Sequence, residues 1–208
     1  MEQKIKRDSV KTAKKILQAA TVEFSLKGLS GARVDTIADR AKTNKRMLYH
    51  YFGNKEQLFL TVLEEAYSKI RSHENDLNLE DLPPEEAVRK LVRFTFNYFV
   101  EHPEFIQLLN SENLYGAEHI KKSKKLLDMT SPLVGKMEDV LRRGVDAGLF
   151  RRDVSPMQLY ITIAALGYFY LSNASTLETI FGRDLKSSEA LSERLAHSEA
   201  VVLGYLRL

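Results

Sequence analysis

Residues 34–55 read VDTIADRAKTNKRMLYHYFGNK and carry the signals for two short helices separated by a tight turn. The first helix is expected from about Val34 to Ala41. Asn44 is a good N-cap for the second helix, which should end near Tyr51, where a Gly-Asn pair breaks it. Two helices this short, three or four residues apart on a basic background, predict a helix-turn-helix DNA-binding unit.

The second short helix has one face for packing and one face for solvent. Leu48 and Phe52, which are one turn apart, should anchor it from beneath, and Ile37 of the first helix should brace it. The outward positions are Asn44, Lys45, Arg46, Tyr49 and His50. An exposed helix of this kind fits the major groove of DNA, about 12 Å wide, with its N-terminal residues nearest the base edges.

The charge of the chain is unevenly distributed. Residues 1–55 hold 13 lysines and arginines against 5 aspartates and glutamates, a balance of +8, whereas residues 56–208 hold 18 against 23, a balance of −5. A basic head on a mildly acidic body indicates that the head meets a polyanion. A solubilising basic surface is the alternative reading of the charge alone.

Helical periodicity continues through the rest of the chain, and no alternation of period two persists anywhere, so an all-α fold is expected. A helix over residues 12–27 should precede the turn unit. The body should begin with a central helix from Pro84 to about His102, because its apolar residues surround it almost completely. Further helices are expected over 103–114, from Pro132 to Gly148, over 155–175 and over 188–206.

The predicted domains follow from this helix order. Residues 1–55 form the DNA-binding head, and residues 55–71 form a long connector helix with a wide apolar stripe. A polar loop from Asn75 to Pro84 is the best boundary. Residues 72–208 then form a helical body for effector binding and dimerisation.

Composition excludes several classes of protein. Hydrophobic residues make up 44% of the chain, enough for a packed core, yet no run of eighteen apolar residues exists, so no membrane span is expected. The charged N-terminus lacks the apolar region of a secretory signal. The absence of cysteine removes disulfides and thiolate metal sites and fits a cytoplasmic protein.

The head resembles the TetR family of bacterial transcriptional regulators over about residues 10–65. The matching positions are Phe24, Lys27-Gly28, Ile37-Ala38, Ala41, Lys45, Leu48-Tyr49, Tyr51-Phe52, Asn54-Lys55-Glu56 and Leu58. The resemblance implies a ligand-released repressor that acts as a homodimer on a pseudo-palindromic operator in double-stranded DNA. Nothing in these residues fixes the sign of regulation.

The resemblance also implies roles for individual residues. Lys45, Tyr49 and His50 would contact phosphates, with Tyr49 or His50 also able to touch a base, and Lys55 would hold a phosphate together with the N-terminus of its helix. Asn44 and Arg46 are the candidates for base readout, because asparagine pairs with adenine and arginine with guanine.

Three further positions surround the turn. Arg33 is placed to reach the DNA backbone, and Thr43 to cap, to contact a phosphate or to touch a thymine methyl group. The family usually has glycine where this chain has Lys42 and a small polar residue where it has Arg33. A non-glycine residue in a left-handed turn costs about 1 kcal/mol, and Lys42 adds a charge beside the DNA.

The body resembles the family's effector-binding and dimerisation region. Its last two long helices are expected to form the homodimer, with ordinary core packing as the alternative for some of their apolar residues. The expected lining of a pocket for a small-molecule effector is Phe94, Tyr98, Asn110, Asn113, Tyr115 and His119, a mixture of apolar walls and a few polar groups. The segments His102-Pro103-Glu104-Phe105, Glu112-Asn113-Leu114 and Asn44-Lys45-Arg46-Met47 are similar to a subgroup that includes pyrimidine-sensing regulators.

Two other classes of protein fit the sequence less well. A helical-bundle enzyme is disfavoured because the five histidines are scattered and no Glu-x-x-His pair, nucleophile elbow or phosphate loop occurs. We therefore expect no catalytic residue, metal or cofactor. A protein-binding adaptor with a basic head would show no salt-dependent binding to duplex DNA.

Overall fold

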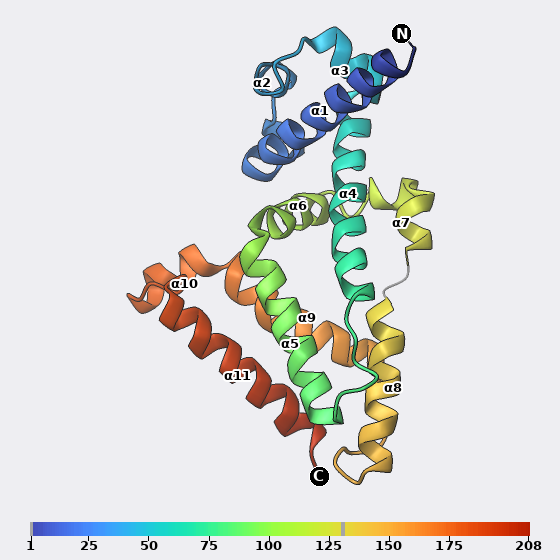
Figure 1. Cartoon of the computed structure of the whole chain (residues 1–208). Helices are drawn as coiled ribbons and strands as arrows, with labels where there is room; N and C mark the ends of the chain where they lie inside the picture. The colour runs from blue at the N-terminus through green and yellow to red at the C-terminus, as the bar shows by residue number, and fades with distance from the viewer. Residues whose placement is uncertain (1, 130–131) are drawn as a thin grey trace. The chain divides into compact units, whose positions relative to one another are not determined.

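The computed structural model describes residues 2–129 and 132–208, and all regular elements in those ranges are helical (Figure 1). The helices are α1 (Glu2–Gly31), α2 (Val34–Arg40), α3 (Lys45–Phe52), α4 (Lys55–Asn75), α5 (Pro84–Glu101), α6 (Pro103–Leu114), the 3-10 turn η1 (Ile120–Lys122), α7 (Lys124–Asp128), α8 (Pro132–Asp146), α9 (Pro156–Ser172), α10 (Ala174–Phe181) and α11 (Ser188–Leu206). The described ranges contain no strand beyond an isolated bridge between Phe150 and Arg207. The predicted all-α fold is confirmed.

The chain divides into two compact units. Unit 1 is Met1–Lys69 with Glu104–Thr130, and unit 2 is Ile70–Pro103 with Ser131–Leu208. Helix α4 belongs to both units, since the boundary falls between Lys69 and Ile70. Unit 1 therefore contains the expected DNA-binding head, the first part of α4 and the segment from α6 to α7.

The core of unit 1 joins the three helices of the head to α4. Phe24 of α1 and Phe59 of α4 are fully buried, and their rings meet edge to face with centroids 5.1 Å apart. Ile37 of α2 and Leu48 of α3 are also fully buried in this cluster. The short helices α2 and α3 are thus held by packing, because helices of this length are not stable alone.

The core of unit 2 is built around α5, which packs against α8, α9 and α11. The buried residues of α5 include Val88, Leu91 and Phe96. Gly167 lets α9 approach α5 closely, because a Cβ atom at this position would lie 3.2 Å from the Phe99 ring. The predicted central position of this helix is confirmed.

Four helical segments differ from the sequence-based expectation. Helix α1 begins at Glu2, ten residues earlier than expected, and its helical geometry breaks at Gly28, where φ is 64°. The helices α7 and α10 and the turn η1 were not expected. The two short elements η1 and α7 lie in a lysine-rich stretch without a clear apolar stripe, whereas α10 continues the apolar run of α9 after a break at Asn173.

Candidate nucleic-acid interface

The turn between α2 and α3 is a Schellman motif with a lysine at its left-handed position. The Thr43 N–H donates to the Ala38 carbonyl and the Lys42 N–H to the Asp39 carbonyl, both at 3.0 Å. These are the two bonds that define the motif, and they satisfy carbonyls at the end of α2. Lys42 has φ 53°, so its backbone is left-handed, as expected for a position where the family usually has glycine.

Replacing Lys42 with glycine is expected to raise the free energy of unfolding by about 1 kcal/mol, because glycine adopts a positive φ without steric cost. The gain would be measured by urea unfolding monitored by circular dichroism. Lys42→Ala is the matched control, since it removes the same charge and keeps the strained backbone. Equal stability of the two variants would show that the left-handed turn carries no strain.

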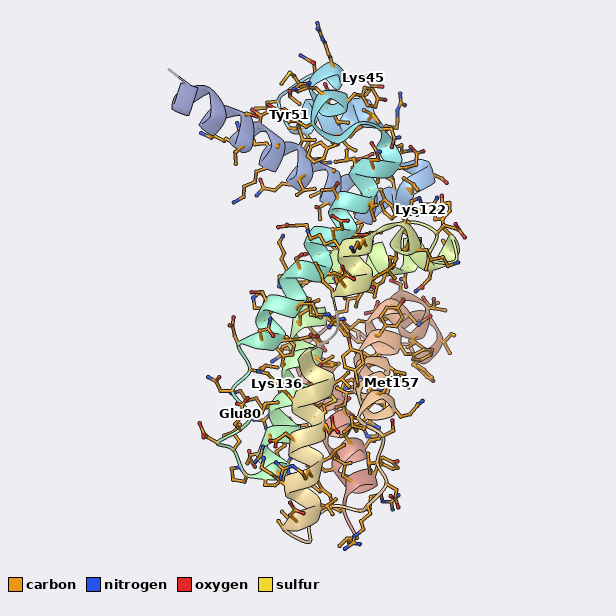
Figure 2. All side chains as sticks on the ribbon, turned by 90° about the vertical axis from the view of Figure 1, so that its right-hand side faces the viewer. Lys45, Tyr51, Glu80, Lys122, Lys136 and Met157 are labelled. Atoms are coloured by element: carbon orange, nitrogen blue, oxygen red, sulfur yellow. The ribbon has the colours of Figure 1, made fainter. Side chains whose placement is uncertain are left out.

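Helix α3 starts immediately after this turn and is capped by its own side chain. The Asn44 Oδ1 accepts a hydrogen bond of 3.0 Å from the Met47 N–H. Leu48 is fully buried beneath the helix. The outward positions predicted from the sequence (Asn44, Lys45, Arg46, Tyr49 and His50) are all exposed, and Figure 2 marks Lys45 on this helix.

Lys45 is held at the surface by an ion pair. Its Nζ lies 2.5 Å from Asp35 Oδ1, and both side chains are about half exposed. A pair in this setting contributes only about 0–1 kcal/mol, so an approaching phosphate can displace the carboxylate. Arg46 has no ion-pair partner among the described residues, which leaves its guanidinium free for a bidentate contact.

The two flanking positions are fixed by contacts within unit 1. Arg33 precedes α2, and its backbone N–H donates to the buried Glu23 carboxylate at 3.2 Å, while its side chain is exposed. Lys55 opens α4 behind the N-cap Asn54, and its Nζ donates to the Ser30 carbonyl at 3.3 Å. Lys55 is half-buried, whereas the other cations of the head whose side chains the structure describes are exposed.

The residues expected to line an effector pocket are distributed over both units. Phe94 and Tyr98 lie on α5 in unit 2, with ring centroids 6.0 Å apart, and Tyr98 also stacks near His102 at 4.4 Å. The other four, Asn110, Asn113, Tyr115 and His119, lie in unit 1. Within unit 1 the rings of Tyr115 and His119 meet edge to face at 5.6 Å.

His119 has a structural partner that the sequence did not indicate. Glu112 is 1% exposed, and its carboxylate accepts hydrogen bonds from the backbone N–H groups of His119 (2.8 Å) and Ile120 (3.0 Å). Its second oxygen lies 2.7 Å from His119 Nδ1. Glu112 therefore anchors the segment after α6, because a buried carboxylate must be satisfied by several donors.

The last long helices have an exposed apolar stripe on one side and core residues on the other. Leu159, Ile163 and Gly167 of α9, and Val202 and Leu206 of α11, are buried within the chain, so ordinary core packing accounts for them. The stripe on the opposite side of α9 consists of Met157, Ile161, Ala165 and Phe169, spaced four residues apart. Val201 and Tyr205 are exposed on α11.

Within residues 2–129 and 132–208, none of the helices combines the length and the hydropathy of a membrane-spanning segment. In the same part of the chain, no group of three His, Cys, Asp or Glu side chains is placed to hold a metal ion.

A packed pair of short helices with an exposed, basic second helix defines a helix-turn-helix DNA-binding protein. Residues 16–62 match the family model described as bacterial regulatory proteins, tetR family, and residues 84–202 match the tetracyclin repressor-like C-terminal domain. The chain belongs to the TetR family of bacterial transcriptional regulators.

Two relatives agree with this assignment, and a solved structure shares the fold. The chain is 40% identical over 197 residues to the HTH-type transcriptional repressor NicS of Pseudomonas putida, covering 95% of this chain and 93% of that protein. It is 25% identical over 204 residues to the regulator RutR of Escherichia coli, covering 97% and 94%. The crystal structure of the Streptomyces coelicolor regulator SCO4942 superposes with a TM-score of 0.69 at 22% identity, covering 94% and 98%.

Proposed function

We propose that this transcriptional regulator acts as a homodimer that represses from a pseudo-palindromic operator and releases it when a small-molecule effector binds. The observation that supports DNA reading most strongly is the exposed face of α3 above a fully buried Leu48. Such a helix can enter the major groove while the rest of the head holds its angle.

The contacts of the head residues support a separate role for each. Arg46 is the base reader, since its free guanidinium can bind guanine with two hydrogen bonds. Asn44 uses its Oδ1 as the helix cap, which leaves its amide N–H₂ group as the donor for DNA. The other proposed contacts are to phosphates, from Arg33, Lys42, Thr43, Lys45, Tyr49, His50 and Lys55.

Dimerisation is proposed through the exposed stripe of α9 and the adjoining face of α11. Four apolar or small side chains at intervals of four residues form a continuous strip along a helix. An apolar strip of this length on a protein surface marks an interaction site. A two-fold dimer would present two α3 helices to two half-sites, about one helical turn apart.

The effector is proposed to act through the body and α4. The aromatic cluster of Phe94, Tyr98 and His102 in unit 2 offers apolar contacts for a small molecule. Helix α4 is shared by both units, so a ligand that favours one arrangement of α4 would alter the spacing of the heads. A coupling of about 1–3 kcal/mol weakens operator binding roughly 5–150-fold.

The experiment compares Arg46→Ala with Lys55→Ala on operator and single-base-changed duplexes. Arg46→Ala is expected to relax preference at one base pair, which costs about 1–3 kcal/mol there, whereas Lys55→Ala should weaken all duplexes alike and reduce the salt slope by about one. Lys69→Ala, an exposed cation farther along α4, is the control. Equal effects of the two head variants would remove the distinction between base readout and phosphate contact.

A further inference from the structure

A second basic surface of the head lies beside the turn, between α1 and the end of α2. It is a concavity of about 350 Å³ within unit 1. Three cations line it from three different elements: Lys15 from α1, Arg40 from the last position of α2, and Lys42 from the turn. Gln18 of α1 adds an amide to the same surface. We refer to this concavity as the α1–turn groove.

The charges of the α1–turn groove are uncompensated. The residues that line it include no carboxylate. Within the described part of the chain, Lys15, Arg40 and Lys42 form no ion pair, in contrast to Lys45, which is paired with Asp35. Three neighbouring cations without a protein partner create a positive potential that favours an anionic one.

The position of the groove indicates which anion would reach it. Lys42 is only two residues before Asn44, the N-cap of α3, and its backbone is fixed by the Schellman turn. The N-terminal end of a recognition helix is the end nearest the base edges. The turn that leads into this end therefore lies at the rim of the major groove, where a phosphodiester strand runs.

We propose that the α1–turn groove is a seat for the phosphodiester backbone of DNA that flanks the bases read by α3. Lys15 and Arg40 then join Lys42 as phosphate contacts that add affinity without adding base preference. This inference rests on the proposed operator binding by α3. A phosphodiester backbone suits the α1–turn groove better than a small anion does. The three cations of the groove are spread along an open concavity with an apolar floor at Ala19 and Ala41.

The test compares the full-length double variant Lys15→Ala/Arg40→Ala with wild type in operator binding at 50 to 200 mM salt. Each lost phosphate contact lowers the slope of log affinity against log salt by about 0.9, so a drop of about 1.8 is expected. Wild type should then lose roughly tenfold more affinity than the variant over this range. Preference for the operator over a scrambled duplex should stay unchanged, since the three groove cations contact no base.

The matched control is Lys14→Ala/Lys27→Ala, which removes two exposed cations of α1 that do not line the groove. Its slope should equal that of wild type. Equal drops in both double variants would overturn the proposal and assign the effect to net charge. An unchanged slope in Lys15→Ala/Arg40→Ala, with wild type still binding the operator, would also overturn it while leaving operator binding by α3 intact.

Two further measurements separate backbone DNA from a free anion. Shortening the operator duplex stepwise from its ends should abolish the difference between Lys15→Ala/Arg40→Ala and wild type once the flanking phosphates are gone. Inorganic phosphate should raise the melting temperature of wild type and of the variant equally. A thermal shift by phosphate that is lost in the variant, together with an unchanged DNA slope, would identify a small-anion site and contradict the proposal.

Discussion

If the proposed homodimer forms through α9, replacing Ile161 and Phe169 together with glutamate is expected to leave a monomer and to weaken operator binding about 100-fold or more. Both side chains are at least half exposed on α9, at 50% and 59%, so the folded monomer tolerates charge there. In a two-fold dimer each would meet its counterpart across an apolar interface, where unpaired carboxylates are costly to bury. Loss of the second head then removes the gain from bivalent binding.

Sedimentation at micromolar concentration and fluorescence anisotropy with an operator duplex measure the two effects. Leu114→Glu is the matched control, because Leu114 is an exposed apolar side chain of unit 1 outside the α9 stripe. Leu114→Glu should leave both the sedimenting mass of the protein and its affinity for the operator unchanged. A double variant that still sediments as a dimer would place the interface elsewhere on the chain.

Phe59→Ala is expected to lower the free energy of unfolding by about 3–5 kcal/mol, the usual cost of deleting a buried phenyl ring. Phe59 is fully buried in unit 1 and contacts two other rings, Phe24 at 5.1 Å and His119 at 5.2 Å. Its loss leaves a cavity where α4, α1 and the segment after α6 meet. Since α3 is held by the same core, operator binding should fall with stability.

Urea unfolding of Phe59→Ala and Phe59→Leu separates cavity formation from a general effect of substitution. Leucine fills much of the space and should cost less than half of the alanine value. Adding operator DNA should recover part of the lost stability of Phe59→Ala, since a ligand of the folded state stabilises it by mass action. A loss below about 1 kcal/mol for alanine would contradict the assigned role of this ring in the core.

The helix-turn-helix could be predicted from the sequence because its signals are local. Asn44 caps the helix that it was expected to cap, and Leu48 is buried where the spacing placed it. Lys42 is left-handed, the conformation that the family's usual glycine favours at this position. Each of these features depends on residues within one or two turns of the chain, so tertiary packing does not override them.

The contacts of the body could not be predicted, since they depend on which helix faces meet. Helix α9 is apolar on most sides, so the sequence alone does not indicate which of its faces is buried. In the structure the face with Leu159 and Ile163 is buried, and the face with Ile161 and Phe169 is exposed. Likewise, a glutamate at position 112 has no local pattern that indicates burial. It becomes an anchor only because the chain returns to place the His119 and Ile120 N–H groups against it.

The start of α1 has a different explanation. Residues 2–11 are mostly charged and polar, so they lack the apolar periodicity from which the helix over 12–27 was predicted. Lysine, glutamate, glutamine and arginine are nevertheless good helix formers, and they extend a helix that is already nucleated. The absence of an apolar stripe therefore marked the end of the packed face and not the end of the helix.

In the proposed function, the head reads a specific operator with α3 and binds its phosphates with the surrounding cations. The most direct measurement is the affinity of the full-length chain for DNA from upstream of its own gene and for a scrambled duplex, between 50 and 200 mM salt. We predict tighter binding to the upstream duplex and a log affinity that falls linearly with log salt, with a slope of about −5 to −9 for 6–10 phosphate contacts. Affinity that stays flat with salt, or that is equal for the two duplexes, would contradict operator reading by α3.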